Sequence, residues 1–175
     1  MAILKVARMG HPVLRAKARQ IDKGELKGAA TQRFIDDMIE TMVEYRGVGL
    51  AAPQVHQSLR IFVAALDAGE ENEPELEPIA VVNPEITIVG ADVVEDWEGC
   101  LSIPDIRGRV PRAREIKVRA LDRKGERIEL TAQNFSARVV QHETDHLDGI
   151  LFFDRMRSFE SLTFLEEYSR YWTKD

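Results

Sequence analysis

The spacing of apolar residues predicts helices near the start, toward the end and at the end of the chain. Within 31–46 they recur every three or four positions, the repeat of a helix with one buried face. A second such pattern spans 135–147, where Asn134 or Ser136 can serve as the N-cap and Gly149 as the stop. An irregular segment and a last helix are expected over 1–30 and 158–171.

The middle of the chain carries the patterns of short strands. Residues 115–121 alternate apolar and polar side chains, and a hairpin turn at 122–125 leads into a partner strand at 127–130. Shorter apolar runs predict further strands at 60–66, 79–82, 85–89 and 92–97. The connections are too short for helical crossovers, so the strands should pair mostly antiparallel. These patterns predict an α+β fold of short antiparallel sheets.

Length and composition favour a single domain over 1–175. A chain of 175 residues rarely divides, and 44% hydrophobic with 31% charged residues is typical of globular proteins. The longest apolar run, 61–66, is far shorter than the roughly 20 residues that cross a membrane. The first residues match neither a secretion signal nor an import leader. We therefore expect no contact with membranes.

The net charge of −6 comes from one segment. Residues 67–78 hold six acidic residues and no basic one, while the rest of the chain carries 24 of each sign. No basic excess points to nucleic acid, although a local basic patch could form around Arg107, Arg109, Arg112 and Arg114. We assign no role to the acidic segment beyond a solvated insertion.

The clearest chemical signal is the run from His142 to His146, in the second predicted helix. Positions i and i+4 share one helix face, so both histidines can present a ring nitrogen to one metal ion. Glu143, beside the first histidine, can reach a water there without binding the metal. The same three residues also occur together by chance, and two such histidines could simply cap a core. Two of the chain's four histidines nevertheless lie in this window, which favours a metal site.

The only cysteine, Cys100, offers a third ligand. A single cysteine excludes an internal disulfide, which favours a reducing compartment, and it is most often a small buried apolar residue. A thiolate is also a good ligand for a borderline transition metal. Two histidines and one cysteine would leave a position open for water, as in catalytic sites. His11 or His56 could instead complete a structural site, but nothing around either one indicates it.

Three short motifs follow one another along the chain, namely GVGLAAPQ at 47–54, EGCLS at 98–102 and QHETDH at 141–146. In these motifs, and from the helix before them to residues 151–154, the chain resembles peptide deformylase. The resemblance implies a hydrolase that removes the formyl group from the N-terminal formyl-methionine of new polypeptides and releases formate. We expect the QHETDH helix at the centre of the sheets, with one helix in the N-terminal half and one at the C-terminus.

The resemblance also implies a metal and a proton carrier. Cys100, His142 and His146 would bind one divalent ion, Fe²⁺ first, with Zn²⁺, Ni²⁺ or Co²⁺ as replacements. The ion would lower the pKa of water, and the resulting hydroxide would attack the formyl carbon. Glu143 would take the proton of that water and pass it to the leaving amine.

Further residues of the motifs would meet the formyl group. The side-chain amide of Gln54 and the backbone N–H of Leu101 would donate hydrogen bonds to its oxygen, where charge develops. Gly49 would leave room beside it. Without the motif, Gln54 would be interpreted as a solvated loop residue and Gly49 as a plain turn glycine.

The methionine side chain requires an apolar pocket, and the peptide requires a groove. Candidate residues for the walls are Val48, Ile103, Val139 and His142. The peptide would lie extended beside Val48 and Gly99, with Arg107 near the mouth. Glu98 and Arg112 would pair and support the cysteine loop, and Arg138, next to the pocket, is expected to point outward.

Two other functions remain open. An HExxH metalloprotease would take its third ligand after the helix, where Glu160, Glu166 and Glu167 are the available carboxylates. An inactive relative would bind metal or a partner without turnover, although Glu143 and Gln54 are not needed to hold a metal. For the deformylase we expect a monomer acting on nascent formyl-methionyl chains in a bacterial cytoplasm, in preference to a processed organellar protein. Residues 155–175 hold four basic and four acidic residues, so a contact with the ribosome would be transient at most.

Overall fold

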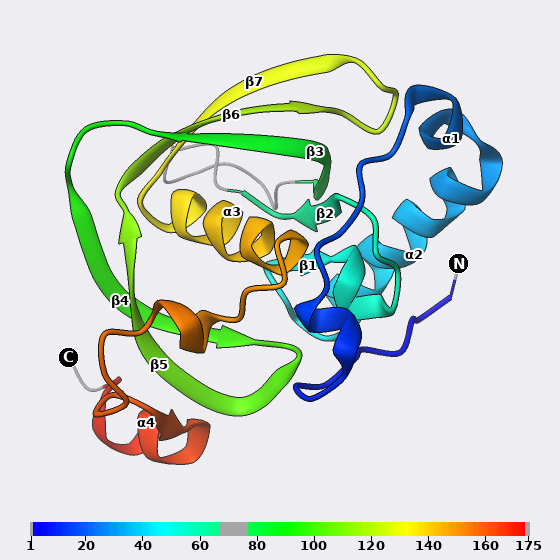
Figure 1. Ribbon diagram of the computed structural model, residues 1–175. Coiled ribbons are helices and arrows are strands. Elements are labelled where there is room, and N and C mark those ends of the chain that lie inside the picture. The colour runs from blue at the N-terminus through cyan, green and yellow to red at the C-terminus, as the bar shows by residue number, and fades with distance from the viewer. Residues whose placement is uncertain (1, 67–76, 174–175) are drawn as a thin grey trace.

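Helix α3 (Asn134–Leu147) lies at the centre of the molecule, between two antiparallel sheets (Figure 1). The computed structural model describes residues 2–66 and 77–173. Ten of the 14 residues of α3 are buried. Within the QHETDH motif, His142, Glu143, Asp145 and His146 are buried, as expected for the central helix of this α+β fold.

The larger sheet has five strands in the order β1-β2-β3-β6-β7, all neighbours antiparallel. Its strands are β1 (Gly49–Ala51), β2 (Ile61–Ala64), β3 (Ile79–Ile88), β6 (Glu115–Leu121) and β7 (Arg127–Gln133). The alternation at 115–121 predicted β6 within its observed bounds. The two strands expected at 79–82 and 85–89 are one strand, because the chain passes the Asn-Pro step with a shift of register between Val82 and Glu85 instead of ending there.

The smaller sheet joins β4 (Val93–Cys100), β5 (Ile103–Ala113) and β8 (Thr163–Phe164). Strands β4 and β5 form a long hairpin whose last pair is Cys100 with Ile103, so the EGCLS motif occupies its tip. The apolar pattern did not predict β5. Two prolines and three arginines interrupt its alternation.

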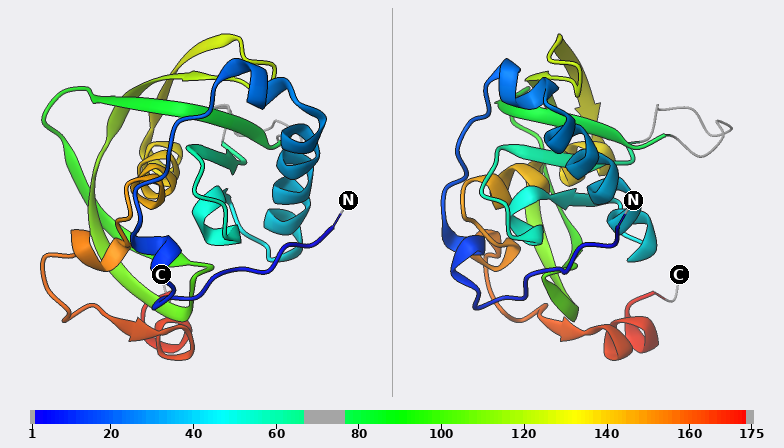
Figure 2. Two further views of the ribbon diagram at one scale, coloured as in Figure 1. Left: turned by 45° about the vertical axis from the view of Figure 1, so that its right-hand side comes forward. Right: turned by 90° about the vertical axis from the view of Figure 1, so that its right-hand side faces the viewer.

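The core is divided between two helices that cover opposite faces of the larger sheet. On β2, Phe62 packs with the α3 residues Val140 and Leu147, whereas Ile61 and Val63 belong to a second cluster. That second cluster contains the apolar face of α2 (Ala29–Glu44). Figure 2 shows α2 and α3 on either side of β1 and β2. The apolar stripe expected at 31–46 thus serves the core.

Both ends of the chain differ from the expected elements. The N-terminal segment contains a 3₁₀ turn, Pro12–Arg15, and the short helix α1 (Lys23–Lys27). The last helix is shorter than expected: α4 spans only Leu165–Tyr171 and follows β8. The acidic segment 67–78 lies, except for its last two residues, outside the described residues.

The start of α3 is also corrected. Its N-cap is Gln133, and both expected caps, Asn134 and Ser136, lie within the helix. Gly149 follows the helix with a φ of 72°, a left-handed conformation that suits a helix stop. None of the helices that the structure describes is long and apolar enough to span a membrane.

Candidate active site

The hairpin tip and α3 bring Cys100, His142 and His146 together. One potential ligand atom from each lies within 4.8 Å of the other two, and all three residues are buried. Cys100 Sγ is 3.3 Å from His146 Nε2. The two imidazole rings meet edge to face at 4.9 Å between centroids, because their residues lie one helical turn apart. Three motif residues from two distant segments therefore converge on one point.

The two histidines have opposite protonation tendencies. His142 Nδ1 lies 2.9 Å from Glu98 Oε2, which leaves its Nε2 for the site. Burial alone would lower the pKa of His142, but hydrogen bonds with Cys100 and Glu98 outweigh burial and raise it well above its usual range. Burial lowers the pKa of His146 well below its usual range, and His142 adds to the effect. His146 is therefore neutral and offers a ring lone pair.

These residues fit a divalent transition metal ion. Within the described part of the chain, Glu143 Oε2 is buried beside the cluster without a hydrogen-bond partner, which is uncommon for a polar atom away from solvent. A thiolate with two imidazoles is the donor set of borderline ions such as Fe²⁺ and Zn²⁺.

Glu143 stands beside this cluster, against Gly49 of β1. Burial raises the pKa of Glu143 to about 7, against the opposing charge of His142. A Cβ atom on Gly49 would lie 2.4 Å from Glu143 Oε1, closer than real Cβ contacts occur. Gly49 therefore gives the Glu143 carboxylate its space, whatever room it also leaves for a substrate.

Gln54 is buried and aims its amide at the same point. Its Oε1 accepts a hydrogen bond from Ala51 N at 2.8 Å, which fixes the orientation of the side chain. Its Nε2 lies 3.5 Å from Cys100 Sγ and 3.2 Å from Ser102 Oγ. The Gln54 amide thus faces the cluster as a hydrogen-bond donor. Its residue type alone would favour a solvated loop position, but the side chain is buried.

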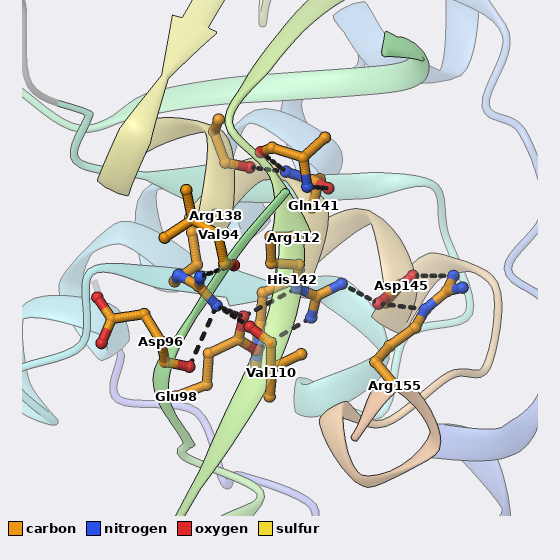
Figure 3. A network of polar contacts seen from close by, with 12 residues as sticks. Val94, Asp96, Glu98, Val110, Arg112, Arg138, Gln141, His142, Asp145 and Arg155 are labelled. Atoms are coloured by element: carbon orange, nitrogen blue, oxygen red, sulfur yellow. Dashed lines mark hydrogen bonds and ion pairs between the residues drawn. The ribbon is translucent and has the colours of Figure 1, made fainter. Parts of the chain in front are cut away.

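Beneath the cluster, three cationic or polar side chains share the carboxylate of Glu98 (Figure 3). Arg112 pairs with both oxygens, at 2.8 and 3.0 Å, and His142 Nδ1 lies 2.9 Å from Oε2. The third partner is Arg138, whose Nη1 lies 2.9 Å from Glu98 Oε1. Burial alone would raise the pKa of Glu98, but its hydrogen bonds with His142 and Arg112 hold it well below its usual range.

The outward direction expected for Arg138 is wrong. Its side chain is buried and donates 2.7 Å hydrogen bonds to the carbonyl oxygens of Val94 and Val110, in addition to its bond with Glu98. The carboxylate and the strand carbonyls together provide the acceptors that a buried guanidinium requires. The expected basic patch at 107–114 is likewise incomplete, because Arg112 is buried with Glu98.

A cavity of about 640 Å³ opens onto the cluster. Val48, Gly99, Arg107 and Val139 line it, as do Leu101 and His142. The Arg107 guanidinium lies so close to Gly99 that a Cβ there would be 2.2 Å from Nη1. Ile103 is not brought to the wall: it is 3% exposed and packs in a cluster with Leu14, Val110 and Phe152.

Comparison with known proteins agrees with this geometry. A family model for polypeptide deformylase matches residues 3–161. The chain belongs to the polypeptide deformylase family. Peptide deformylase 2 of Nostoc sp. is 43% identical over 99% of this chain and 97% of its own length. The peptide deformylase of Thermus thermophilus is 46% identical over 90% of this chain and 84% of its own.

A solved structure is similar as well. The Met-Ala-Ser bound class I type b peptide deformylase of Acinetobacter baumannii has a TM-score of 0.81, at 41% identity over 89% of this chain and 99% of that one. The resemblance stated from the three motifs is thereby confirmed. Cys100 is the third potential ligand beside the two histidines. Glu166 and Glu167, which a metalloprotease could use as its third ligand, instead pair with Arg170 on α4.

Several residues that line the deformylase cavity carry no sequence signal of that position. They come from five separate segments: Lys5, Arg8, Arg46, Trp97, Phe135 and Leu165. No motif contains them, and only the fold brings the N-terminal segment and α4 to one cavity. Arg138 did carry a signal, since a cationic residue on the buried face of α3 requires an acidic partner.

Proposed function

We propose that this deformylase hydrolyses the formyl amide at the N-terminus of formyl-methionyl polypeptides and uses Glu143 to move the proton. The observation that carries the proposal is the buried Cys100, His142 and His146 cluster, with the unpartnered carboxylate oxygen of Glu143 beside it. Hydrolysis of an amide requires an activated water and a proton for the leaving nitrogen. One ion site and one mobile proton acceptor meet both requirements.

Cys100, His142 and His146 would hold one divalent ion, Fe²⁺ first and Zn²⁺, Ni²⁺ or Co²⁺ as substitutes, which supplies Lewis-acid activation of water and of the formyl oxygen. Glu143 then accepts the proton of the attacking water at its carboxylate and donates it to the amine that leaves. A pKa of about 7 suits a group that must both accept and release a proton at neutral pH.

The formyl oxygen gains negative charge during attack, and two donors face it in this proposal. Gln54 Nε2 points toward Cys100, with its amide held from the other side by Ala51 N. The backbone N–H of Leu101 follows the cysteine at the hairpin tip. A donor of this kind contributes about 3 kcal/mol to the transition state in a site that excludes water. Donors fixed in advance cost no reorganisation when the charge appears.

The rest of the cavity would position the peptide. Val139 lies one helical turn before Glu143 and, with Val48 and His142, forms the apolar wall for the methionine side chain. The peptide backbone would run extended beside Val48 and Gly99. The related Acinetobacter baumannii structure is one with Met-Ala-Ser bound, which supports a short methionyl peptide as the occupant of this cavity. This proposal gives Ile103 no role in the pocket, because it is not among the described residues that line the cavity.

The supporting residues act on the ligands. Glu98 would fix the Nδ1 proton of His142, so that Nε2 faces the ion, and Arg112 would hold Glu98 in place. The partners we propose are nascent formyl-methionyl chains met by a monomer in a bacterial cytoplasm, with transient ribosome contact. A single domain over 1–175 is sufficient for this role.

The test is formate release from formyl-Met-Ala-Ser by protein prepared without oxygen and loaded with Fe²⁺ or Ni²⁺. We expect rapid release, its abolition by a chelator, and its return on adding the ion. A folded, metal-loaded protein that releases no formate would contradict the proposal. Cleavage of unblocked peptides by that protein would then indicate the metalloprotease, and no cleavage of either substrate would indicate the inactive relative.

A further inference from the structure

Three cationic side chains line the cavity without acidic partners. Lys5, Arg8 and Arg46 are exposed and belong to its wall. Within 2–66 and 77–173, no residue forms an ion pair or a side-chain hydrogen bond with any of them. An exposed charge that lines a cavity stands at its mouth. These three residues, the rim cations, are therefore free to meet charge on whatever enters.

The backbone that carries Lys5 and Arg8 is fixed against the active site. Ala7 N donates to Gln54 O at 2.7 Å, and Met9 N donates to Ser102 O at 2.8 Å, so the segment with Lys5 and Arg8 runs beside two motifs. Arg46 lies in the turn after α2, where its N–H bonds to Val43 O at 2.9 Å. Although their tips are exposed, the rim cations have defined positions at the entrance.

The charge at the entrance differs from that of the whole chain. The protein has a net charge of −6, yet the exposed part of the described cavity wall carries only one carboxylate, Asp105. The other acidic lining residues, Glu98 and Glu143, are buried at the active site. Arg107, half-buried, adds a fourth cation. The positive rim is therefore a local feature that overall composition does not explain.

We propose that Lys5, Arg8 and Arg46 favour formyl-methionyl polypeptides that carry acidic side chains in the residues after the methionine. This inference rests on the proposed function, because it assumes that the formyl end lies at the buried cluster. A polypeptide whose first residue is held there must leave through the mouth, so its next residues pass the rim. Opposite charges there increase the rate of encounter and pair transiently with the chain.

The preference should be modest and sensitive to salt. Single exposed ion pairs contribute little, so three rim cations together give about a threefold to tenfold difference in kcat/KM between acidic and basic peptides at low ionic strength. Salt at 0.5 M shortens the Debye length to about 4 Å, and the difference should fall below about twofold. A neutral peptide should lie between the two.

The experiment compares formyl-Met-Ala-Glu, formyl-Met-Ala-Gln and formyl-Met-Ala-Lys on the metal-loaded protein at low and high salt. We expect kcat/KM to decrease in that order at low salt, and the order to reverse in the variant Lys5→Glu/Arg8→Glu/Arg46→Glu. The matched control Lys117→Glu/Lys124→Glu/Arg127→Glu changes the net charge equally on the β6–β7 hairpin and should keep the order. Binding of Met-Ala-Glu and Met-Ala-Lys by titration calorimetry gives a readout independent of turnover.

Equal values for the three peptides in the unaltered protein would overturn the proposal. A reversal in the hairpin control would also overturn it, since net charge rather than the rim would then decide. Loss of ribosome binding in the rim variant, without any peptide preference, would assign the rim to RNA phosphates instead. If even formyl-Met-Ala-Gln is not hydrolysed, the proposed function fails, and the calorimetric comparison alone decides on the rim.

Discussion

Arg138 Nη1 lies 2.9 Å from Glu98 Oε1, where the two side chains are only 7% and 4% exposed. This ion pair connects the first half of α3 to β4, next to the contact between Glu98 and His142. It completes the set of partners around a buried carboxylate, together with Arg112 and His142. Figure 3 shows the three groups converging on Glu98. The position of His142, one of the three candidate metal ligands, thus depends on a carboxylate that two arginines hold.

Replacing Arg138 should therefore destabilise the protein. Arg138→Met removes one partner of Glu98 and leaves the carbonyls of Val94 and Val110 without their donor. We expect the free energy of unfolding to fall by about 2–3 kcal/mol, measured by urea denaturation. Arg127→Met, at an exposed position on β7, is the control and should change it by less than about 0.5 kcal/mol. A similar loss of unfolding free energy in Arg138→Met and Arg127→Met would contradict the stabilising role of the buried Arg138 side chain.

Glu98 should control the affinity for metal. Glu98→Gln keeps the size of the side chain but removes the charge that fixes the Nδ1 proton of His142. We expect metal affinity to decrease by about 10- to 100-fold, measured by competition with a chelator. Glu95→Gln, on the same strand, should leave the affinity unchanged. Unaltered affinity in the Glu98 variant would show that His142 is oriented by other contacts.

The sequence predicted most accurately the helices and strands whose apolar pattern depends only on residues close together in the chain. Residues 115–121 alternate because one face of β6 is buried, and the stripe at 31–46 marks the buried face of α2. Strand β5 was missed because its charged residues are stabilised by groups distant in sequence. Arg112, for example, pairs with Glu98 and Asp145. The expected helix at 158–171 was too long because a helical repeat does not reveal where pairing of β8 with β5 interrupts it.

The residues of the candidate site also divide into those that the sequence predicted and those that only the fold reveals. The spacing of two histidines and the family motifs predicted Cys100, His142 and His146, which the fold brings together. The direction of Arg138 was wrong, because the acceptors that bring it inside lie about 30 to 40 residues away on β4 and β5. The rim cations carry no motif at all. Only folding places the N-terminal segment beside Gln54 and Ser102.

Gly49 should be required by Glu143. In Gly49→Ala, the new Cβ would lie 2.4 Å from Glu143 Oε1, so the carboxylate must move. We expect kcat for formyl-Met-Ala-Ser to fall by at least about tenfold, since displacement of a catalytic group by 1 Å can cost about 100-fold. Bound metal should stay near one ion per chain. Gly24→Ala, on α1, is the control for the added methyl group and should retain full kcat.

The Asp154 carboxylate should make a small, pH-dependent contribution to stability. Burial opposes ionisation, but hydrogen bonds from Arg15 and from Leu151 N outweigh it and lower the pKa of Asp154. Stability from a lowered pKa is present above the pKa in the unfolded chain, about 3.9, and is lost as the pH falls through the folded value. Asp154→Asn should thus reduce the free energy of unfolding at pH 6 by less than about 1 kcal/mol, since the pair is partly exposed.

Below pH 3 the difference between the Asp154→Asn variant and the unaltered protein should shrink. Urea denaturation at the two pH values measures it. Asp92→Asn removes a carboxylate that is 82% exposed and 3.9 Å from Arg114, so it should have a smaller effect at pH 6. A difference for Asp154→Asn that grows with acidity would contradict the sign of this pKa shift.

The central claim is that Glu143 moves the proton in a site whose metal is held by other residues. Its most direct test is to measure bound metal and formate release together in the Glu143→Gln variant. We predict about one ion per chain, as in the unaltered protein, with formate release from formyl-Met-Ala-Ser reduced at least about 100-fold. Release at the original rate, with the ion in place, would contradict the claim.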